Sequence, residues 1–421
     1  MTLSRRGFIK SGAVTMFSLG FGGFVPDFLV QAAAATRPTL SRKNKVLVCI
    51  YQRGAMDGLM AVTPFKDEAL KKMRPDLFLS PTGNNNKNAL IDLDGTFGLH
   101  PSMKSFEPLF KQKQLAIVHG VGSPFNSRSH FDAQDYMESG TPGDKTTHDG
   151  WLNRLISAVN NNNSPFQAVS ITNNLPKSFL GKNPALAISN LKDFALQVKR
   201  NPAALSVSAK SFEDLYDHTS SQLLNKAGKE SFEAIKILDE KNVQNYKPAN
   251  AAAYPLSKLG ASLKQIAQLV KMDVGLEVAF AESTGWDTHF NQGSDTGVFA
   301  RNVEDLSTSI NAFWQDLGDY QDQVTVMTMT EFGRTVAQNG SKGTDHGRAS
   351  CMFVLGKDVK GGQVHGTMKS LEKANLEDGR DLPVTTDFRN LFNEVAAKHL
   401  NLKDSKALFP NFTPQKMGIM V

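Results

Sequence analysis

The feature that most constrains the fold is a repeated pattern, in which a short apolar run ends in glycine and polar residues. The first run, residues 45–51, leads into Gln52-Arg53-Gly54-Ala55-Met56-Asp57-Gly58. Continuous apolar runs of this length are typical of strands buried on both faces of a parallel sheet. Such runs occur at residues 45–51, 115–122, 168–171, 276–281, 324–329 and 351–356.

Helical patterns fit between these runs, so the sequence predicts an α/β fold with a mostly parallel central sheet and helices on both faces. Functional sites in such sheets lie at the carboxyl ends of the strands. Polar character rises between residues 166 and 262, where residues 211–241 form a charged amphipathic stretch. This region is either a helical insertion on the sheet or a set of ordinary connecting helices.

The amino terminus resembles a twin-arginine export signal. Ser4-Arg5-Arg6-Gly7-Phe8-Ile9-Lys10 precedes an apolar stretch with Pro26 and Asp27 inside it, and Ala32 to Ala35 supply a cleavage site. The stretch is shorter than the about 20 apolar residues of a membrane anchor. We therefore expect residues 1–35 to be removed by the twin-arginine machinery. Residues 36–421 would then form a periplasmic or otherwise exported domain without a stable anchor.

Charge and cysteine content exclude two classes of protein. The net charge of the 421 residues is +6, of which three cations and Asp27 in the signal segment contribute +2. The remaining excess of about +4 forms no long basic run, so nucleic acid is not an expected partner. Cys49 and Cys351 each lie in an apolar run, which indicates core residues and not a disulfide framework.

Carboxylate and imidazole side chains follow four of the expected strands. Each has an ordinary structural explanation when taken singly, but together they predict a metal site at one edge of the sheet. Oxygen and nitrogen ligands without thiolate suit one or two ions of Zn, Mn, Mg or Ca. The candidate ligands are Asp57, Asp287, His289, Glu331, Asp345 and His346.

Ser129 is the candidate nucleophile, because it opens an expected helix directly after a strand. The free N–H groups and dipole of a helix start favour a deprotonated hydroxyl there. Ser129 could equally be the helix N-cap. Arg53, Arg128 and Arg334 adjoin the same loops, where they could bind phosphate or sulfate oxygens or pair with the acidic ligands.

Five blocks of the sequence resemble the DUF1501 family of exported bacterial proteins, and the similarity covers nearly the whole mature chain. That family is similar in layout to the alkaline phosphatase and sulfatase superfamily. The resemblance implies an alkaline phosphatase-like fold, one or two metals at strand ends, and a Ser, Thr or formylglycine nucleophile. The blocks are Arg53-Gly54-Ala55-Met56-Asp57-Gly58-Leu59, Arg128-Ser129-His130-Phe131, Gly285-Trp286-Asp287-Thr288-His289, Thr330-Glu331-Phe332-Gly333-Arg334 and Gly343-Thr344-Asp345-His346-Gly347.

Carried over by residue, the resemblance makes Asp57 the metal-bridging acid and Ser129 the nucleophile. It makes Asp287 and His289 ligands of the first metal. Two registers compete for the second site. In one, Asp345 and His346 supply it. In the other, Glu331 supplies it, and His346 corresponds to a single histidine that the superfamily has later in the chain, before the next strand. We favour this second register because Glu331 directly follows its strand.

Three departures qualify the resemblance. His289 lies two residues beyond its acid, where the superfamily has four, and Phe332 stands where a histidine ligand is expected. Neither cysteine lies in a Cys-x-Pro-x-Arg motif, which argues against a formylglycine sulfatase.

Two functions follow. The first is a metal-dependent hydrolase of a small phosphate or sulfate ester, with Ser129 as nucleophile and Arg128 or Arg53 stabilising charge. The second is a non-catalytic envelope protein that binds a glycan or a protein partner on the same fold.

Overall fold

The computed structural model describes residues 44–81, 88–159, 164–194, 234, 237–238 and 243–421. The expected export signal and most of the charged stretch within the expected insertion lie outside the described residues. None of the helices in the described ranges combines the length and apolarity that crossing a bilayer requires.

All six apolar runs form strands of one nine-stranded sheet, as the pattern predicted. Along the sheet the order is β11-β5-β10-β9-β1-β8-β6-β7, with β12 paired to β5. The strands are β1 (Val46–Arg53), β5 (Leu115–Gly122), β6 (Ala168–Ser170), β7 (Leu186–Ala187), β8 (Val278–Thr284), β9 (Val324–Met329), β10 (Ser350–Leu355), β11 (Val364–His365) and β12 (Thr386–Asp387).

The direction of the strands brings distant loops to one edge of the sheet. β1 runs parallel to both of its neighbours, β8 and β9, whereas β10 runs antiparallel to β9 and β5. The amino end of β10 therefore lies at the same edge as the carboxyl ends of β1, β5, β8 and β9. That edge is where the sequence predicts the functional site.

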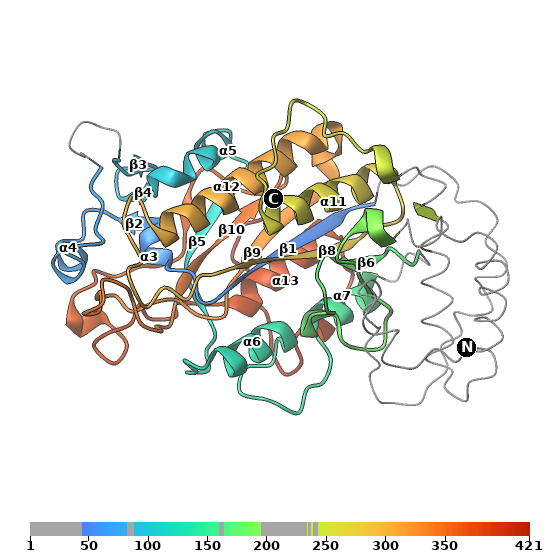
Figure 1. Ribbon diagram of the computed structural model, residues 1–421. Coiled ribbons are helices and arrows are strands. Elements are labelled where there is room, and N and C mark those ends of the chain that lie inside the picture. Colours follow the sequence, from blue (N-terminus) through green and yellow to red (C-terminus); the bar gives the residue numbers. More distant parts are fainter. Residues whose placement is uncertain (1–43, 82–87, 160–163, 195–233, 235–236, 239–242) are drawn as a thin grey trace, which may run out of the picture.

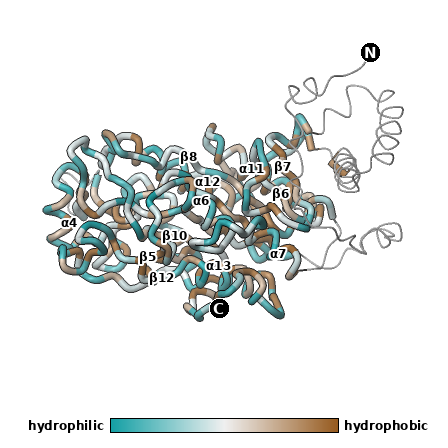
Figure 2. The backbone as a smooth tube through the Cα atoms, turned by 90° about the horizontal axis from the view of Figure 1, so that it is seen from below, coloured by the Kyte–Doolittle hydropathy of each residue, from teal (hydrophilic) through white to brown (hydrophobic). Residues whose placement is uncertain are grey.

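Helices cover both faces of the sheet, which confirms the predicted fold class. On one face, α11 (Lys258–Met272) and α12 (Val298–Leu317) pack over side chains of β1 such as Val48 and Ile50. On the other, α7 (Trp151–Val159) and α13 (Phe388–His399) pack over Leu47 and Cys49. α6 (His130–Ser139) lies on the same side of the sheet as α7 and α13, the side that faces the viewer in Figure 2.

Smaller elements complete the described chain. A three-stranded sheet has the order β2-β4-β3. Its strands and the remaining helices are β2 (Val62–Pro64), β3 (Ile91–Asp92), β4 (Phe97–Leu99), α3 (Gly58–Ala61), α4 (Glu68–Met73), α5 (Glu107–Lys111), η2 (Pro101–Phe106), η3 (Lys177–Phe179), η4 (Val243–Asn245), η5 (Gly318–Gln323), η6 (Lys373–Asn375) and η7 (Lys406–Leu408).

Both cysteines are core residues, as predicted. Cys49 in β1 and Cys351 in β10 are fully buried free thiols. Burial raises the pKa of each thiol well above its usual range, so both are inert at neutral pH.

His399 makes the stability of the fold depend on pH. Its Nε2 donates to the Val46 carbonyl at 3.0 Å and its Nδ1 accepts from the Thr325 hydroxyl at 2.9 Å, so the buried ring is neutral. Burial lowers its pKa from 6.5 to about 4. The unfolded chain therefore binds a proton between pH 6.5 and 4 that the folded chain does not.

We expect His399 to lower the free energy of unfolding by about 3 kcal/mol as the pH drops from 6.5 to 4. The His399→Gln variant should lose that part of the dependence, measured by urea unfolding at several pH values. The exposed His148→Gln variant is the control and should keep the wild-type dependence. Equal pH dependence in wild type and His399→Gln would contradict the assignment.

Candidate metal centre

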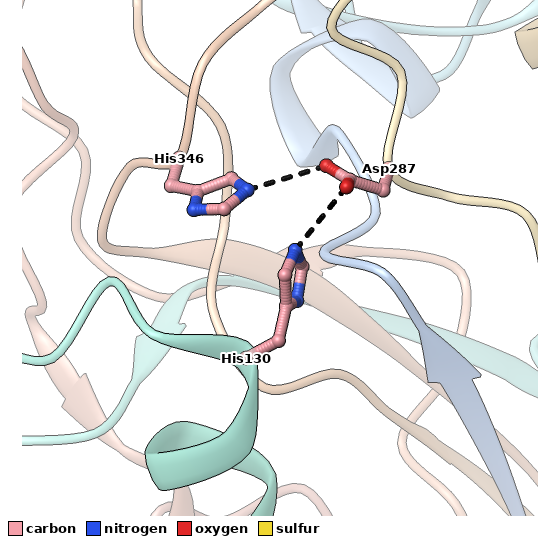
Figure 3. Close-up of side chains that lie close together, drawn as sticks. All are labelled: His130, Asp287 and His346. Carbon is pink, nitrogen blue, oxygen red and sulfur yellow. Dashed lines mark hydrogen bonds and ion pairs between the residues drawn. The ribbon is translucent and has the colours of Figure 1, made fainter.

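Three histidines and one aspartate meet at the predicted edge of the sheet. The ligand atoms of His130, Asp287 and His346 lie within 4.8 Å of one another (Figure 3). His289 joins them: its Nε2 lies 3.1 Å from an Asp287 oxygen and 2.8 Å from the Nε2 of His346. The His346 Nε2 is 3.2 Å and the His130 Nε2 3.5 Å from the Asp287 carboxylate.

Each residue of this cluster comes from a different part of the shared edge. His130 is the first residue of α6, which follows β5 and is capped by the Ser129 hydroxyl. Asp287 and His289 lie in the loop after β8, and His346 lies shortly before β10. The antiparallel direction of β10 is what brings His346 to the carboxyl ends of the other strands.

Gly54 allows the loop after β8 to cross over the end of β1. Its φ is +114°, and a Cβ atom at this position would lie 2.6 Å from the backbone nitrogen of Asp287. Its N–H donates to a Glu331 oxygen at 2.8 Å. Glycine is therefore required here by the approach of Asp287, and not by direct contact with a ligand.

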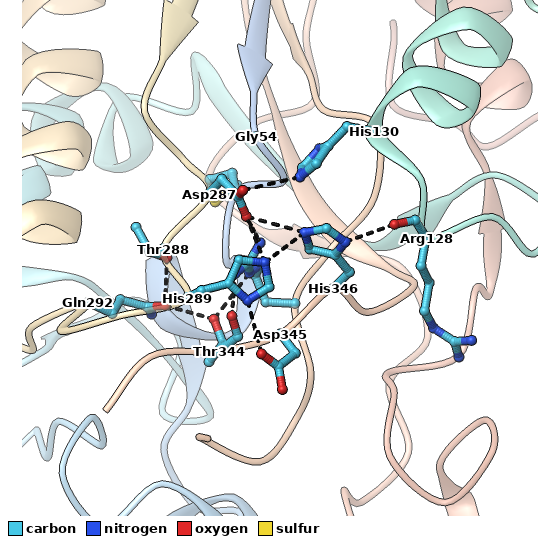
Figure 4. A network of polar contacts seen from close by, with 12 residues as sticks. Gly54, Arg128, His130, Asp287, Thr288, His289, Gln292, Thr344, Asp345 and His346 are labelled. Atoms are coloured by element: carbon cyan, nitrogen blue, oxygen red, sulfur yellow. Dashed lines mark hydrogen bonds and ion pairs between the residues drawn. The ribbon is translucent and has the colours of Figure 1, made fainter. Parts of the chain in front are cut away.

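The Nδ1 atom of each histidine is held by an acceptor outside the cluster. Glu331 lies 2.8 Å from the Nδ1 of His130, and Asp345 lies 2.9 Å from that of His289. The Arg128 carbonyl lies 2.8 Å from the Nδ1 of His346 (Figure 4). Carboxylates and carbonyls accept hydrogen bonds, so each Nδ1 carries a proton and each Nε2 of a neutral ring presents a lone pair.

A cation between these nitrogens would satisfy the lone pairs of neutral rings. Without one, the 2.8 Å approach of the His289 and His346 Nε2 atoms sets two acceptors against each other. Buried His130 Nε2 forms no hydrogen bond with any described residue. Histidines that ligate metals donate the other ring nitrogen to a carboxylate or carbonyl, as all three do here. The donor set thus fits a divalent ion.

Electrostatics favour charged carboxylates both in the cluster and around it. Burial alone would raise the pKa of Glu331, but hydrogen bonds from His130 and Gln134 outweigh burial and lower it. Partial burial would also raise the pKa of Asp287, but the hydrogen bond and charge of Arg334, together with the nearby histidines, outweigh burial and lower it. The bond to Glu331 raises the pKa of His130, whereas burial lowers that of His346.

A chain of buried side chains fixes the Asp287 carboxylate. Arg334 donates to an Asp287 oxygen at 2.7 Å and to the Thr344 hydroxyl at 3.2 Å. The hydroxyls of Thr344 and Thr288 both donate to the Gln292 side-chain oxygen at 2.7 Å (Figure 4). The rotamer of Asp287 therefore depends on the packing of two loops, after β8 and before β10.

Asp57, a predicted ligand, lies outside the cluster. Its two oxygens accept from the Arg74 guanidinium at 2.8 and 3.1 Å, and one also accepts from Gln292 at 2.8 Å. Asp57 and Arg74 are both 1% exposed. This buried ion pair occupies the carboxylate that sequence reasoning assigned to a bridging role.

Glu331 and Asp345, the alternatives for the second site, both lie one step outside the cluster. Each carboxylate hydrogen-bonds a histidine Nδ1 instead of reaching the centre.

Phe332 does not leave a gap where a histidine was expected. Its ring packs 4.9 Å from that of His130 and 5.0 Å from that of His346.

Ser129, Arg128 and Arg53 surround the cluster in different roles. The exposed Ser129 caps α6 by accepting from the Asp132 N–H at 3.4 Å. The Arg128 side chain pairs with two carboxylates, those of Asp381 and Asp378. Arg53 pairs with two other carboxylates, those of Glu138 at 2.9 Å and Glu282 at 2.6 Å.

Sequence reasoning missed His130. The residue stands in one of the quoted blocks, at the start of a helix after a strand, but the adjacent Ser129 drew the assignment. The sequence did contain a signal for this ligand, because a histidine at the first position of a helix that follows a strand lies at the edge where the site is expected.

A family profile described as "Protein of unknown function (DUF1501)" matches residues 44–409. The chain belongs to this family. Four of the five blocks of this DUF1501 protein contribute a side chain to the cluster or hold one of its histidines, and the first contributes Gly54. No curated protein sequence matches the chain.

Three solved structures are similar to this DUF1501 protein at low sequence identity. The PsFucS1 sulfatase from Pseudoalteromonas sp. is 12% identical, with 90% of this chain and 72% of that chain covered and a TM-score of 0.38. Ps i-CgsB in complex with k-i-k-neocarrahexaose is 10% identical, with 88% and 74% covered and a TM-score of 0.39. The lipoteichoic acid synthase LtaP from Listeria monocytogenes is 9% identical, with 82% and 75% covered and a TM-score of 0.34.

Proposed function

We propose that this protein is an exported, metal-dependent hydrolase of phosphate or sulfate esters. The observation that carries the proposal is that the Nε2 atoms of three histidines lie beside the carboxylate of Asp287. The ion would be held by His130, His289, His346 and Asp287, whose side chains are 23–45% exposed and thus reachable by a substrate. When bound, such an ion polarises an ester oxygen and lowers the pKa of a neighbouring hydroxyl or water.

The arrangement supports one ion and favours zinc among the four candidates. Asp57 is engaged by Arg74, while Glu331 and Asp345 orient histidines, so no second set of ligands remains among the predicted residues. Imidazole nitrogen is a preferred ligand of zinc, whereas magnesium and calcium prefer oxygen.

Ser129 remains the proposed nucleophile. Its hydroxyl is exposed at the amino end of α6 and precedes His130. The Ser129 oxygen would attack phosphorus or sulfur and expel the alcohol, which takes up a proton. Water would then release the inorganic anion and restore the hydroxyl. Arg53 and Arg128 each already pair with two carboxylates, which argues against the ester-binding role first expected of them.

Two exposed aromatic rings support the second candidate, a non-catalytic binding protein for a glycan or an envelope protein. Phe131 is 90% exposed and Phe290 70% exposed, and each directly follows a histidine of the cluster. Exposed apolar side chains gathered at one site are a mark of interaction surfaces. On this interpretation the ion would serve structure or ligand binding.

Export by the twin-arginine machinery fits either candidate. A cluster assembled from the ends of β5, β8 and β10 exists only in the folded chain. Because metal binding and folding are coupled, a route that carries folded proteins allows the ion to be installed first.

Replacing the carboxylate that holds His130 should weaken metal binding without removing a ligand. For Glu331→Gln we expect a zinc affinity about 10–100-fold lower, because the histidine loses its anionic partner. Affinity is measured by competition with a chelator. Glu107→Gln, which loses only a surface ion pair with Lys111, is the control and should bind zinc as the wild type does. Unchanged affinity in Glu331→Gln would contradict the outer role assigned to this carboxylate.

Ser129→Ala tests the reaction. With zinc content equal to wild type, turnover of 4-nitrophenyl phosphate or 4-nitrophenyl sulfate should fall about 10³-fold or more. Ser257→Ala, which removes the N-cap hydroxyl of α11, is the matched control and should retain activity. Full activity in Ser129→Ala would exclude the serine mechanism. A zinc-loaded wild type that turns over neither ester would favour the binding protein.

A further inference from the structure

A second polar site lies beside the metal centre, at the ends of β6 and β8. A cavity of about 470 Å³ opens there between the strand ends and the first halves of α11 and α12. Ligands of α/β proteins bind outside the carboxyl ends of parallel strands, in pockets of about 300–1,000 Å³. The cavity has the position and the size of a ligand site, and nothing in the cluster of histidines occupies it.

Most of the residues that line the cavity carry a hydroxyl, amide, carboxylate or ammonium group. Most ligand pockets are largely apolar, so a polar lining indicates a ligand with many hydrogen-bonding groups. The carboxylates of Glu282 and Asp305 outnumber the single ammonium group of Lys258, so the charge of the lining disfavours an anion, and carboxylates accept hydrogen bonds from hydroxyls. Buried Ile171 and Leu259 supply an apolar wall of the kind that the C–H face of a sugar ring contacts.

Several lining side chains are already fixed by hydrogen bonds. Gln265 accepts from the Leu191 N–H at 2.7 Å, and Asn302 donates to the Gly285 carbonyl at 2.7 Å. Glu282 is held at 2.6 Å by Arg53. A lining held in this way loses little conformational entropy when a ligand binds.

The cavity is connected to the metal centre. Arg53 donates to Glu282 on the cavity side and to Gln134 at 3.0 Å on the other, and Gln134 donates to Glu331 at 2.9 Å. Thr284, which lines the cavity, is three residues before Asp287, a distance of at most about 11 Å along an extended chain. A ligand in the cavity could therefore present a substituent to the cluster.

We propose that this cavity binds a sugar ring, that is, an uncharged polyhydroxyl ligand. The carboxylates and amides bind its hydroxyls, and Ile171 and Leu259 contact its C–H face. The site does not depend on metal or on ester hydrolysis, although its position suits the sugar part of a carbohydrate ester.

The test fills the cavity from its exposed edge. Ala261 lines the cavity on α11 and is exposed, so Ala261→Trp blocks the site without disturbing the core. Glu304→Trp places the same side chain on an exposed position of α12 outside the cavity and is the matched control. The probes are the methyl β-glycosides of glucose, galactose and N-acetylglucosamine, titrated into the full purified chain by ligand-detected NMR.

We expect at least one glycoside to bind the wild type and Glu304→Trp with equal, millimolar affinity, and Ala261→Trp to bind it at least tenfold more weakly. Adding EDTA should change none of these affinities, which separates this site from the metal centre. Failure of all three glycosides to bind would overturn the proposal, as would equal binding by Ala261→Trp. Sugar binding by a protein without ester turnover would reject the hydrolase alone.

Discussion

The hydrogen bonds at three Nδ1 atoms are the constraint on which the candidate site depends. Glu331, Asp345 and the Arg128 carbonyl each accept from one histidine and thereby turn its Nε2 toward Asp287. Loss of any one acceptor frees a ring to rotate or to change tautomer. The site is therefore defined as much by its outer acceptors as by its four inner side chains.

The outer acceptors are in turn fixed by the fold. Glu331 is fully buried directly after β9, where the Gly54 N–H and Gln134 also donate to it. The Asp57–Arg74 ion pair anchors Gln292, which joins the loops that carry Asp287 and His346. Removing one partner of such a buried pair costs about 3–5 kcal/mol, so we regard Asp57 as part of the scaffold.

The sequence was sufficient to predict the sheet, and it pointed to three of the four side chains that lie in the candidate cluster. Continuous apolar runs predicted all six main strands because burial on both faces leaves little choice of residue. Asp287, His289 and His346 were predicted because they follow or precede strands at one edge. The roles of Asp57 and Glu331 were not predictable, since a buried carboxylate looks the same in sequence whether it faces an arginine, a histidine or an ion. His130 joins the cluster only through the placement of α6, a tertiary property.

The central claim is that three imidazoles and one carboxylate share one ion. X-ray absorption at the zinc edge of the zinc-loaded protein tests it most directly. We predict one zinc per chain, with three imidazole nitrogens and one oxygen at about 2.0–2.2 Å and the multiple-scattering pattern of histidine rings. A shell made of oxygen alone, with no histidine scattering, would contradict it.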